Sequence, residues 1–590
     1  MKKTLVLLLA LVLSLGLAGA MAEPLECDVL VVGGGGAGMT AAISAAQAGA
    51  KVILIEKQGY LGGATMMSAG LLPAVGTAQQ IDAGIDDNLE WFVRDIERPS
   101  NYAVREELVY AVAENAKPTL EWLESLGVNF SIVTSSLYYG QSNYRMHLAE
   151  GAGKGLSDKL IEYIGGVDNI TVMLNTPGTG LLTDEVGAVI GVTANTADGE
   201  VEIHAGNTIL ATSGFAANHE MVEKYMPEVA SAQPYYAPGA TGDGILWGQS
   251  IGAAVANMGA YQGHAFYGVG YGPTDQSIAN KGGIFVNQNG VRFTNEYGGY
   301  SELTPHVLHQ PGHYAYMVFD SNIAESTAKL SDFQDAGIVF TADTPEALAE
   351  QLSIDPAKLA QTFNEYAASI ERGEDEFNRT HLPASFDAPY YAIKITGDLR
   401  HTQGGLVTDI ATHVLREDGT LIPGLYAAGG VMEGFSSTGG PGYMSGNGLM
   451  QAVIYGKIAG EHAATETRGE AEIVHYDFPE DEIAAAEATS IRTVGGADVK
   501  FVDGEYNGMG TGHGGDITVK VVIADGKIAS IEVVSQSETP AIYDTAEAPM
   551  LAAFVESNGT DVDTVSGATD SSTGLIEAVS NALLVALGSK

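Results

Sequence analysis

The sequence predicts a multidomain α/β protein, and three features of the chain lead to this expectation. Its 590 residues, of which 45% are hydrophobic, are enough for several cores rather than one. Near the N-terminus, an apolar run (Cys27–Val32), a glycine-rich turn, a small-residue stretch (Met39–Ala48) and a second apolar run (Lys51–Ile55) predict a strand, a turn, a helix and a strand. Near the C-terminus, the runs Ile517–Ile523 and Lys527–Val534 flank an Asp-Gly pair, which predicts a β-hairpin.

The composition excludes several classes of protein. The formal net charge is -45, from 28 Lys and Arg against 73 Asp and Glu, so the surface repels nucleic acid and anionic membranes. Cys27 is the single cysteine, which rules out an internal disulfide, an iron–sulfur cluster and a cysteine-based zinc site. We therefore expect no nucleic-acid partner, no metal, and redox chemistry that runs on organic cofactors.

Residues 1–22 have the pattern of a cleavable export signal. Lys2 and Lys3 precede an apolar run from Thr4 to Leu17, and Ala20-Met21-Ala22 offers a small-residue cleavage site. The alternatives are a buried core helix or a membrane anchor, but the run is short for a span of about 20 residues. We expect an exported protein, periplasmic or otherwise extracytoplasmic.

The glycine-rich turn has the spacing of a dinucleotide-binding site. Gly33, Gly35 and Gly38 satisfy the pattern GxGxxG between the first expected strand and the helix. Such glycines permit the tight turn and let a pyrophosphate approach the backbone at the helix N-terminus. Glu56, at the end of the second expected strand, can accept hydrogen bonds from ribose hydroxyls.

Several further motifs resemble the fumarate reductase and succinate dehydrogenase flavoprotein family, including flavocytochrome c and urocanate reductase. They are Gly62-Gly63 soon after Glu56, Ile209–Phe215 (ILATSGF) and Leu421–Gly430 (LIPGLYAAGG), and they occur in the family's order. The resemblance covers about residues 26–465. It implies a Rossmann-like domain that binds FAD non-covalently, with contacts from Gly62, Gly63, Ala64, Gly429 and Asn447.

The resemblance also implies an inserted α+β cap domain that binds substrate. The segment Gly282–Glu296 (GGIFVNQNGVRFTNE) matches the family's cap signature, and Asn289-Gly290 within it is a hairpin signal. The family's active site lies between the cap and the FAD-binding domain. The expected domains are a signal peptide (1–22), an FAD-binding domain in two parts (23–258 and 388–466), the cap (259–387), a linker (467–499) and a small α+β domain (500–590).

The last domain resembles the FMN-binding domain of respiratory flavoproteins. Asp563 to Thr569 read Asp-Thr-Val-Ser-Gly-Ala-Thr, and an apolar helix pattern follows from Gly574 to Leu587. In those proteins the final threonine carries FMN through a phosphoester that a separate flavin transferase makes. The resemblance therefore implies covalent FMN on Thr569. The alternative is an ordinary turn in which Ser571 or Thr573 caps the last helix.

The expected active site departs from the family pattern. Relatives reduce a C=C bond by hydride from the flavin and a proton from an arginine. When the sequences are aligned on the cap signature, Tyr300 takes the place of that arginine. In a C-terminal motif, where the family reads N-R-L-G-G-N and this chain reads Gly442 to Asn447, Tyr443 takes the place of an arginine that clamps the substrate carboxylate. His401 keeps the family's histidine. The family's Thr-Glu-x-x-Arg site falls on Asp275, Gln276 and Ala279.

These departures predict that fumarate is a poor substrate, because a dicarboxylate needs cationic partners. Tyrosines suit a neutral, larger carbonyl compound, although both could simply pack. Five further basic residues could supply positive charge, which leaves an arylacrylate open: Arg145, His147, His264, His306 and Arg400.

The expected function is an extracytoplasmic ene-reductase of an α,β-unsaturated carbonyl compound, with Tyr300, His401 and Tyr443 as catalytic candidates. FMN would take electrons from a membrane-side donor and pass them to FAD. One alternative is a dehydrogenase of a neutral, ketosteroid-like substrate. Another is an electron-transfer flavoprotein without its own substrate.

Overall fold

In this computed structural model the described residues are 23–379, 381–468, 499–512, 516–536 and 540–586, the last range without 561, 563, 566 and 567. The expected signal peptide therefore lies outside the described residues, as does most of the expected linker. The described chain divides into two compact units, which are taken separately below. The first unit comprises Met1–Pro73, Asn115–Val133 and Met146–Phe478, and the second comprises Ala74–Glu114, Thr134–Arg145 and Pro479–Lys590.

The first unit is built on a mainly parallel sheet, as the Rossmann-like prediction requires. Its central strands follow the order β19-β20-β9-β1-β2-β6, and β8 and β7 extend it antiparallel from β9. The last four residues of β1 and all four residues of β2 are buried, which explains the apolar run that each contains. The strands are β1 (Leu25–Val32), β2 (Val52–Ile55), β6 (Ile170–Met173), β7 (Gly178–Thr183), β8 (Val189–Thr196), β9 (Gly199–Leu210), β19 (His413–Leu415) and β20 (Leu421–Ala427).

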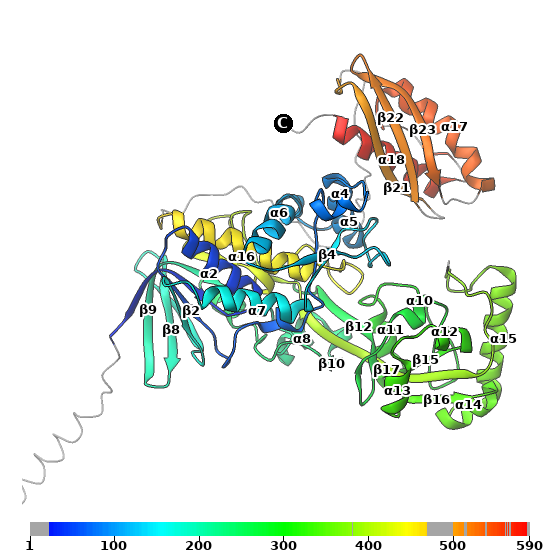
Figure 1. Cartoon of the computed structure of the whole chain (residues 1–590), viewed down its shortest axis with the longest axis horizontal. Coiled ribbons are helices and arrows are strands. Elements are labelled where there is room, and N and C mark those ends of the chain that lie inside the picture. Colours follow the sequence, from blue (N-terminus) through cyan, green and yellow to red (C-terminus); the bar gives the residue numbers. More distant parts are fainter. Residues whose placement is uncertain are drawn as a thin grey trace, which may run out of the picture. The chain divides into compact units, whose positions relative to one another are not determined.

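Helices α2 and α16 pack side by side against this sheet (Figure 1). Their backbones approach so closely that a Cβ at Gly456 would lie 2.4 Å from Ala37 O, and one at Gly460 2.2 Å from Ala41 O. Small residues on both helices permit this packing. The helices of this domain are α2 (Gly36–Gln47), α3 (Gly63–Met67), α7 (Ala152–Ile164), α8 (His219–Tyr225), α9 (Asp243–Ser250) and α16 (Asn447–Thr465).

The cap is the α+β part of the same unit, drawn in green in Figure 1. Its sheet has the order β13-β12-β17-β15-β14, and β10 and β16 also pair with β17. The strands are β10 (Gln233–Pro234), β12 (Tyr261–Gly268), β13 (Gly272–Pro273), β14 (Ile284–Val286), β15 (Ala315–Phe319), β16 (Val339–Ala342) and β17 (Tyr390–Thr402). The helices are α10 (Ser277–Asn280), α11 (Leu303–Leu308), α12 (Ser321–Glu325), α13 (Leu330–Asp335), α14 (Pro345–Leu352) and α15 (Pro356–Arg372).

Two small sheets complete the first unit. One pairs β11 (Val255–Ala256) with β18 (Gly405–Leu406), and the other has the order β3-β5-β4, from Leu71–Pro73, Met146–Ala149 and Phe130–Ile132.

The second unit combines two parts of the chain. Its first part, called the helical arm below, consists of Ala74–Glu114 and Thr134–Arg145 and carries α4 (Ala78–Asp82), α5 (Leu89–Glu97) and the start of α6 (Glu106–Ser125). No sequence motif indicates that the arm groups with C-terminal residues. The domain boundaries expected from the sequence remain predictions.

The other part of the second unit is the C-terminal α+β domain, drawn in orange and red in Figure 1. Its antiparallel sheet has the order β21-β22-β23, from Gly504–Thr511, Asp516–Ala524 and Lys527–Gln536. The predicted hairpin is present, and both turn residues, Asp525 and Gly526, have positive φ, as a tight hairpin needs. Helices α17 (Pro540–Ser557) and α18 (Thr569–Ala586) contact this sheet.

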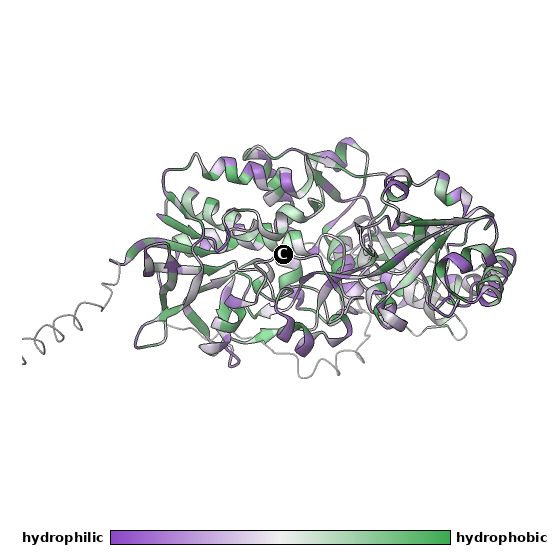
Figure 2. Cartoon of the chain, turned by 90° about the horizontal axis from the view of Figure 1, so that it is seen from below, coloured by the Kyte–Doolittle hydropathy of each residue, from purple (hydrophilic) through white to green (hydrophobic). Residues whose placement is uncertain are grey.

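Hydrophilic and hydrophobic residues alternate along the ribbons of many helices (Figure 2), as expected of helices with one face turned to solvent. Across the residues that the structure describes, no helix has the length and apolar character of a membrane span.

Candidate active site

The three motif glycines at the start of α2 serve different purposes. Gly33 has φ of +110°, and a Cβ there would lie 2.4 Å from Ala211 O. A Cβ at Gly38 would lie 1.8 Å from Gly33 O. Gly35 is different, because a Cβ there would meet nothing within 4 Å. Gly33 and Gly38 are thus required by the packing of the protein itself, while Gly35 borders open space of the kind that a pyrophosphate would fill.

The residues after the second strand surround the same turn. The Glu56 carboxylate accepts hydrogen bonds from the backbone N–H of Gly34 (2.6 Å) and of Gln58 (2.7 Å), which hold it at the glycine turn. Gly62 and Gly63 have φ of +122° and +49°, and their left-handed backbone starts α3, in which Ala64 is the second residue.

Buried acceptors near the start of α16 fit a cofactor with N–H and O–H donors. The Asn447 and Gln451 side chains donate to Ser436 Oγ (3.1 Å) and to Gly429 O (3.0 Å). Their carbonyl oxygens, Oδ1 and Oε1, are buried and have no hydrogen-bond partner among the described residues. Because a buried acceptor without a donor is costly, these atoms fit the hydroxyl and N–H groups of FAD.

Three of the predicted catalytic residues lie together in the first unit. Tyr443, in the loop before α16, is 5.4 Å from His401 and 6.2 Å from Tyr300, measured between ring centroids. His264 on β12 stacks on the Tyr300 ring at 4.2 Å, with 23° between the ring planes. Strands β12 and β17 pair next to these rings, and irregular register around His264 sets its position relative to His401. His264 was only an unplaced basic residue in the sequence.

Ser445 is a site residue that the sequence did not reveal. Its Oγ lies 2.7 Å from the hydroxyl of Tyr300, and both side chains are buried. Either hydroxyl can be the donor. Tyr300 and Ser445 are 145 residues apart, so no local pattern could have found the pair.

Burial keeps the rings of this cluster neutral. Burial lowers the pKa of His401 to about 4, and the nearby Arg400 adds to this effect. Burial and Arg400 likewise hold the pKa of His264 well below 6.5. Burial, followed by the charge of Tyr300, raises the pKa of Tyr443 well above 10. At neutral pH these side chains can donate or accept hydrogen bonds but carry no charge.

The positive charge beside this cluster is already paired. Arg400 donates two hydrogen bonds of 3.0 Å to the buried carboxylate of Asp398, and its guanidinium lies over the Tyr235 ring at 4.7 Å. This bidentate pair leaves little uncompensated charge for a substrate.

Three other basic residues considered from the sequence have structural partners. Arg145, in the second unit, is fully buried and pairs with Asp87 and Asp95. His147 lies on β5 with Nδ1 3.3 Å from Leu72 O, and His306 Nδ1 lies 2.7 Å from Thr294 Oγ1.

The positions of the family's Thr-Glu-x-x-Arg site lie at α10, where Asp275 Oδ1 accepts from Ser277 N.

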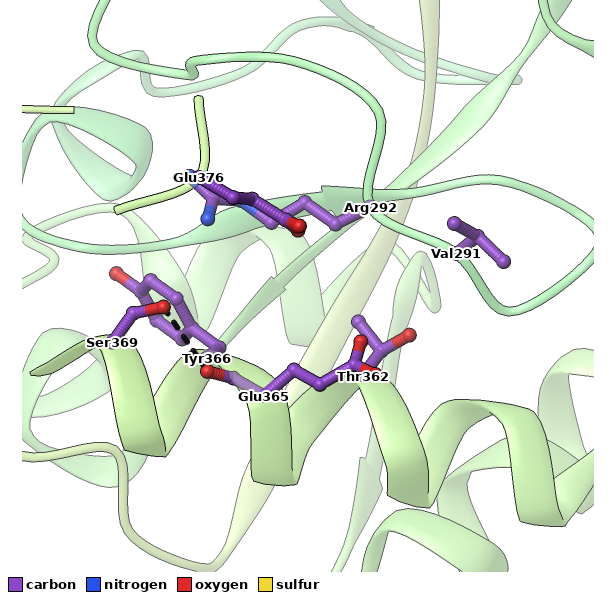
Figure 3. A pocket seen from close by; sticks show the side chains of 7 residues that line it. All are labelled: Val291, Arg292, Thr362, Glu365, Tyr366, Ser369 and Glu376. Atoms are coloured by element: carbon purple, nitrogen blue, oxygen red, sulfur yellow. Dashed lines mark hydrogen bonds between the residues drawn. The ribbon is translucent and has the colours of Figure 1, made fainter. Parts of the chain in front are cut away.

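The cap contains a separate hollow that does not resemble a substrate site. Its cavity volume is about 20 Å³, little more than one water molecule needs, whereas typical ligand sites occupy ~300–1,000 Å³. Figure 3 shows Arg292 and Glu376 facing side chains of α15 across it. Arg292 is nevertheless engaged in ion pairs with Glu296 and Asp375, so its role is to hold the cap together. These pairs also explain why the turn at Asn289-Gly290 is followed by a single bridge, Val286 to Arg292, and not by a second strand.

Thr569 is the first residue of α18, the position where a helix N-terminus favours a phosphate. Asp563, Ser566, Gly567 and the Thr569 side chain lie outside the described residues. Ser572 holds the preceding loop, because its Oγ accepts from Val565 N (3.0 Å) and donates to Ala568 O (2.8 Å).

Fold and site together define a flavoprotein with one domain for FAD and another for FMN. Comparison with known families agrees, since a model described as FAD binding domain matches residues 28–449 and one described as FMN-binding domain matches residues 512–584.

A fumarate reductase (cytochrome) from Shewanella frigidimarina is 34% identical over 443 residues, covering 74% of this chain and 77% of the relative. The open conformation of a flavocytochrome c3 fumarate reductase superposes with a TM-score of 0.67 at 30% identity, covering 77% of this chain and 80% of that structure. A 3-ketosteroid-Δ4-(5α)-dehydrogenase from Rhodococcus jostii RHA1, in complex with 4-androstene-3,17-dione, superposes with a TM-score of 0.63 at 26% identity, covering 76% of this chain and 99% of that structure.

The chain belongs to the fumarate reductase-type family of FAD flavoproteins. It is a flavin-dependent oxidoreductase that acts on carbon–carbon bonds.

Proposed function

We propose that this protein reduces the C=C bond of an α,β-unsaturated carbonyl compound that is neutral or carries a single negative charge. The observation that carries the proposal is the pair Tyr300–Ser445, two hydroxyls 2.7 Å apart at the position where relatives place a proton-donating arginine.

The cofactors supply the electrons. Gly33, Gly35, Gly38, Glu56, Gly62, Gly63, Ala64, Gly429 and Asn447 would hold FAD, and Thr569 would carry FMN as a phosphoester. When bound, FAD supplies the hydride for the β-carbon of the substrate, and FMN supplies the electrons that reduce FAD.

The protein's own residues orient and polarise the substrate carbonyl. Tyr443 is buried and neutral, so its phenol can donate a hydrogen bond to the carbonyl oxygen. His401 is also neutral, and the Gln403 amide lies 3.3 Å from its Nδ1. His401 Nδ1 can accept from Gln403 or donate to Thr402 O at 3.4 Å. In the first tautomer the proton is on Nε2, and we propose that Nε2 is then a second donor for the same oxygen.

The proton for the α-carbon comes from the Tyr300 hydroxyl. A free phenol, with a pKa near ~10, is a reluctant acid, so the phenolate that remains must be stabilised. Ser445 can do this by donating its O–H to the phenolate oxygen. His264, stacked on the other face of the ring, fixes its orientation.

The charges in the site disfavour dicarboxylates. Arg400 is neutralised by Asp398, and His264 and His401 are uncharged at neutral pH. A second buried carboxylate would lack a partner at a cost of several kcal/mol.

A second candidate is the reverse reaction, the dehydrogenation of a saturated cyclic ketone. It is favoured by the likeness to the ketosteroid dehydrogenase, whose structure holds a neutral steroid ketone. In this direction the Tyr300 phenolate would accept the proton, and Ser445 would stabilise that phenolate beforehand by donating its O–H. Anaerobic assays with reduced and with oxidised dyes separate the two directions.

The proposal also includes the location of the enzyme, its electron donor and the enzyme that attaches its FMN. Residues 1–22 would direct export, a membrane-side donor would reduce the FMN, and a flavin transferase would attach it. Sequencing the N-terminus of the protein recovered outside the cytoplasm tests the first point, because export predicts a start at Glu23.

Replacing Tyr300 tests the proposed function. The change Tyr300→Phe keeps the ring and its stack with His264 but removes the acid, so turnover should fall by about 10²–10⁴-fold while FAD content is unchanged. The control is Tyr297→Phe, an exposed tyrosine three residues earlier that stacks on His381. Full activity of Tyr300→Phe with a good enone substrate would contradict the role of Tyr300.

A further inference from the structure

The C-terminal domain has a hydrophobic core of its own. The buried cluster that holds its sheet and helices together is drawn entirely from residues between Phe501 and Ala586. No residue of the helical arm contributes to that cluster. A domain with a complete core of its own can change its contacts with neighbouring parts of the chain without unfolding.

Arg94 of α5 and Tyr102, both in the helical arm, make polar contacts with this domain. Arg94 Nη1 donates to Met509 O on β21 (2.5 Å), and its Nε lies 3.8 Å from Glu577 Oε1 on α18. Tyr102 of the arm adds a contact of 3.4 Å from its hydroxyl to Glu577 Oε1. Arg94 is 4% exposed and Glu577 is 17% exposed, so the contact is largely shielded from solvent.

Hydrogen bonds within the arm fix the orientation of the Arg94 side chain. Its Nη2 donates to Ser142 Oγ (2.9 Å) and to the fully buried carboxylate of Asp95 (3.2 Å). Burial alone would raise the pKa of Asp95, but Arg145 and then Arg94 hold it at about 2. The guanidinium is therefore pre-oriented, and little conformational freedom is lost when a partner binds it.

We propose that Arg94 is the docking residue for the FMN-binding domain. Its hydrogen bond to Met509 O and its ion pair with Glu577 hold that domain on the helical arm, in the state from which electrons pass to the FAD-binding domain. The contact is small and polar, as expected of a domain that docks and releases during turnover. The electron-transfer part of this proposal rests on the proposed function, but the docking itself does not.

Electron paramagnetic resonance distances test the docking without any flavin or substrate. Spin labels are placed on Ile81→Cys in the arm and Val534→Cys in the domain, positions that are 70% and 58% exposed, in a Cys27→Ala background. The wild-type pair should give one narrow distance distribution. Arg94→Ala and Glu577→Gln should each broaden it, while Lys154→Ala, which removes an exposed charge elsewhere, should leave it narrow.

The measured distance distributions can either support or overturn the docking proposal. A broad distribution in the wild type, or an unchanged narrow one in both Arg94→Ala and Glu577→Gln, would overturn the proposal. If Arg94→Ala fails to fold, Glu577→Gln decides alone, because Glu577 is a partly exposed residue outside the buried core of its domain.

Stopped-flow mixing with a reduced dye gives the second readout. The electron-transfer step between the two flavins should slow at least about tenfold in Arg94→Ala, with the absorption spectra of both flavins unchanged. An unchanged rate in a variant whose distances have broadened would show that docking is not needed for electron transfer. If the distances behave as expected but no unsaturated carbonyl compound reoxidises the protein, the proposed function fails and the docking contact stands.

Discussion

At the residue scale, the same motif contains positions with unlike roles. Gly33 and Gly38 avoid clashes with backbone atoms, whereas Gly35 borders empty space. A sequence pattern cannot make this distinction, because all three positions read as glycine. The structure separates glycines needed for folding from the one whose missing side chain leaves room for a cofactor.

Thr569 provides the test at this scale. After co-expression with a flavin transferase, the intact mass of the wild type should exceed that of the apoprotein by one FMN attached through a phosphoester. Thr569→Ala should lack this mass and keep its FAD, since the two flavins bind to different domains. Thr573→Ala is the matched control. An unmodified wild type, or FMN retained by Thr569→Ala, would disprove covalent attachment at this residue.

Much of the candidate site followed from motifs, and the remainder depended on contacts that motifs do not encode. Tyr300, His401 and Tyr443 could be placed because each aligns with a functional position of the family that the chain resembles. Ser445 could not, since its role comes from a contact with a residue 145 positions away. For the same reason, the sequence could not show that Asp398 neutralises Arg400.

At the element scale, local sequence patterns correctly predicted elements whose pairing partners are close by in the sequence. The strand–helix–strand unit at the N-terminus and the hairpin of β22 and β23 both form as predicted. The turn at Asn289-Gly290 forms too, but its second arm is not a strand, because Arg292 turns into ion pairs with Glu296 and Asp375. Asp375 is 83 residues away, so a distant partner overrides the local pattern.

A cluster at the end of α16 gives a pH-dependent element. His413 on β19 lies 2.8 Å from Asp409 Oδ2 and 2.7 Å from Glu466 Oε2, and Glu466 also bonds His462 (2.5 Å) and Tyr426 (3.2 Å). Burial alone would lower the pKa of His413, but hydrogen bonds and charges from Asp409 and Glu466 raise it.

This pKa shift predicts the sign of a stability change. A histidine with a raised pKa binds its proton more tightly in the folded protein, so its contribution is complete below about pH 6.5 and is lost as the pH rises through the folded pKa. The Tm difference between wild type and His413→Gln should therefore be largest near pH 6 and shrink by pH 9. His219→Gln, at an exposed ion pair, is the control. A difference that grows with pH would contradict the assignment.

At the scale of the whole molecule, the grouping of the helical arm with the C-terminal domain was beyond sequence reasoning. Arg94 and Met509 are 415 residues apart and share no motif. The expectation of organic cofactors, drawn from the single cysteine, agrees with the matches to an FAD-binding and an FMN-binding domain. What the protein reduces depends on charge balance in a site assembled from four separate stretches of chain.

The most direct test of that charge balance is the rate at which substrates reoxidise the dye-reduced protein under anaerobic conditions. Fumarate, an arylacrylate and the enone 4-androstene-3,17-dione should be compared at equal concentration. Our account predicts that the enone or the monoanion reoxidises the flavins at least about 100-fold faster than fumarate, which corresponds to roughly 3 kcal/mol for an unpaired carboxylate. Reoxidation by fumarate that is as fast as by either of the other two compounds would contradict the account.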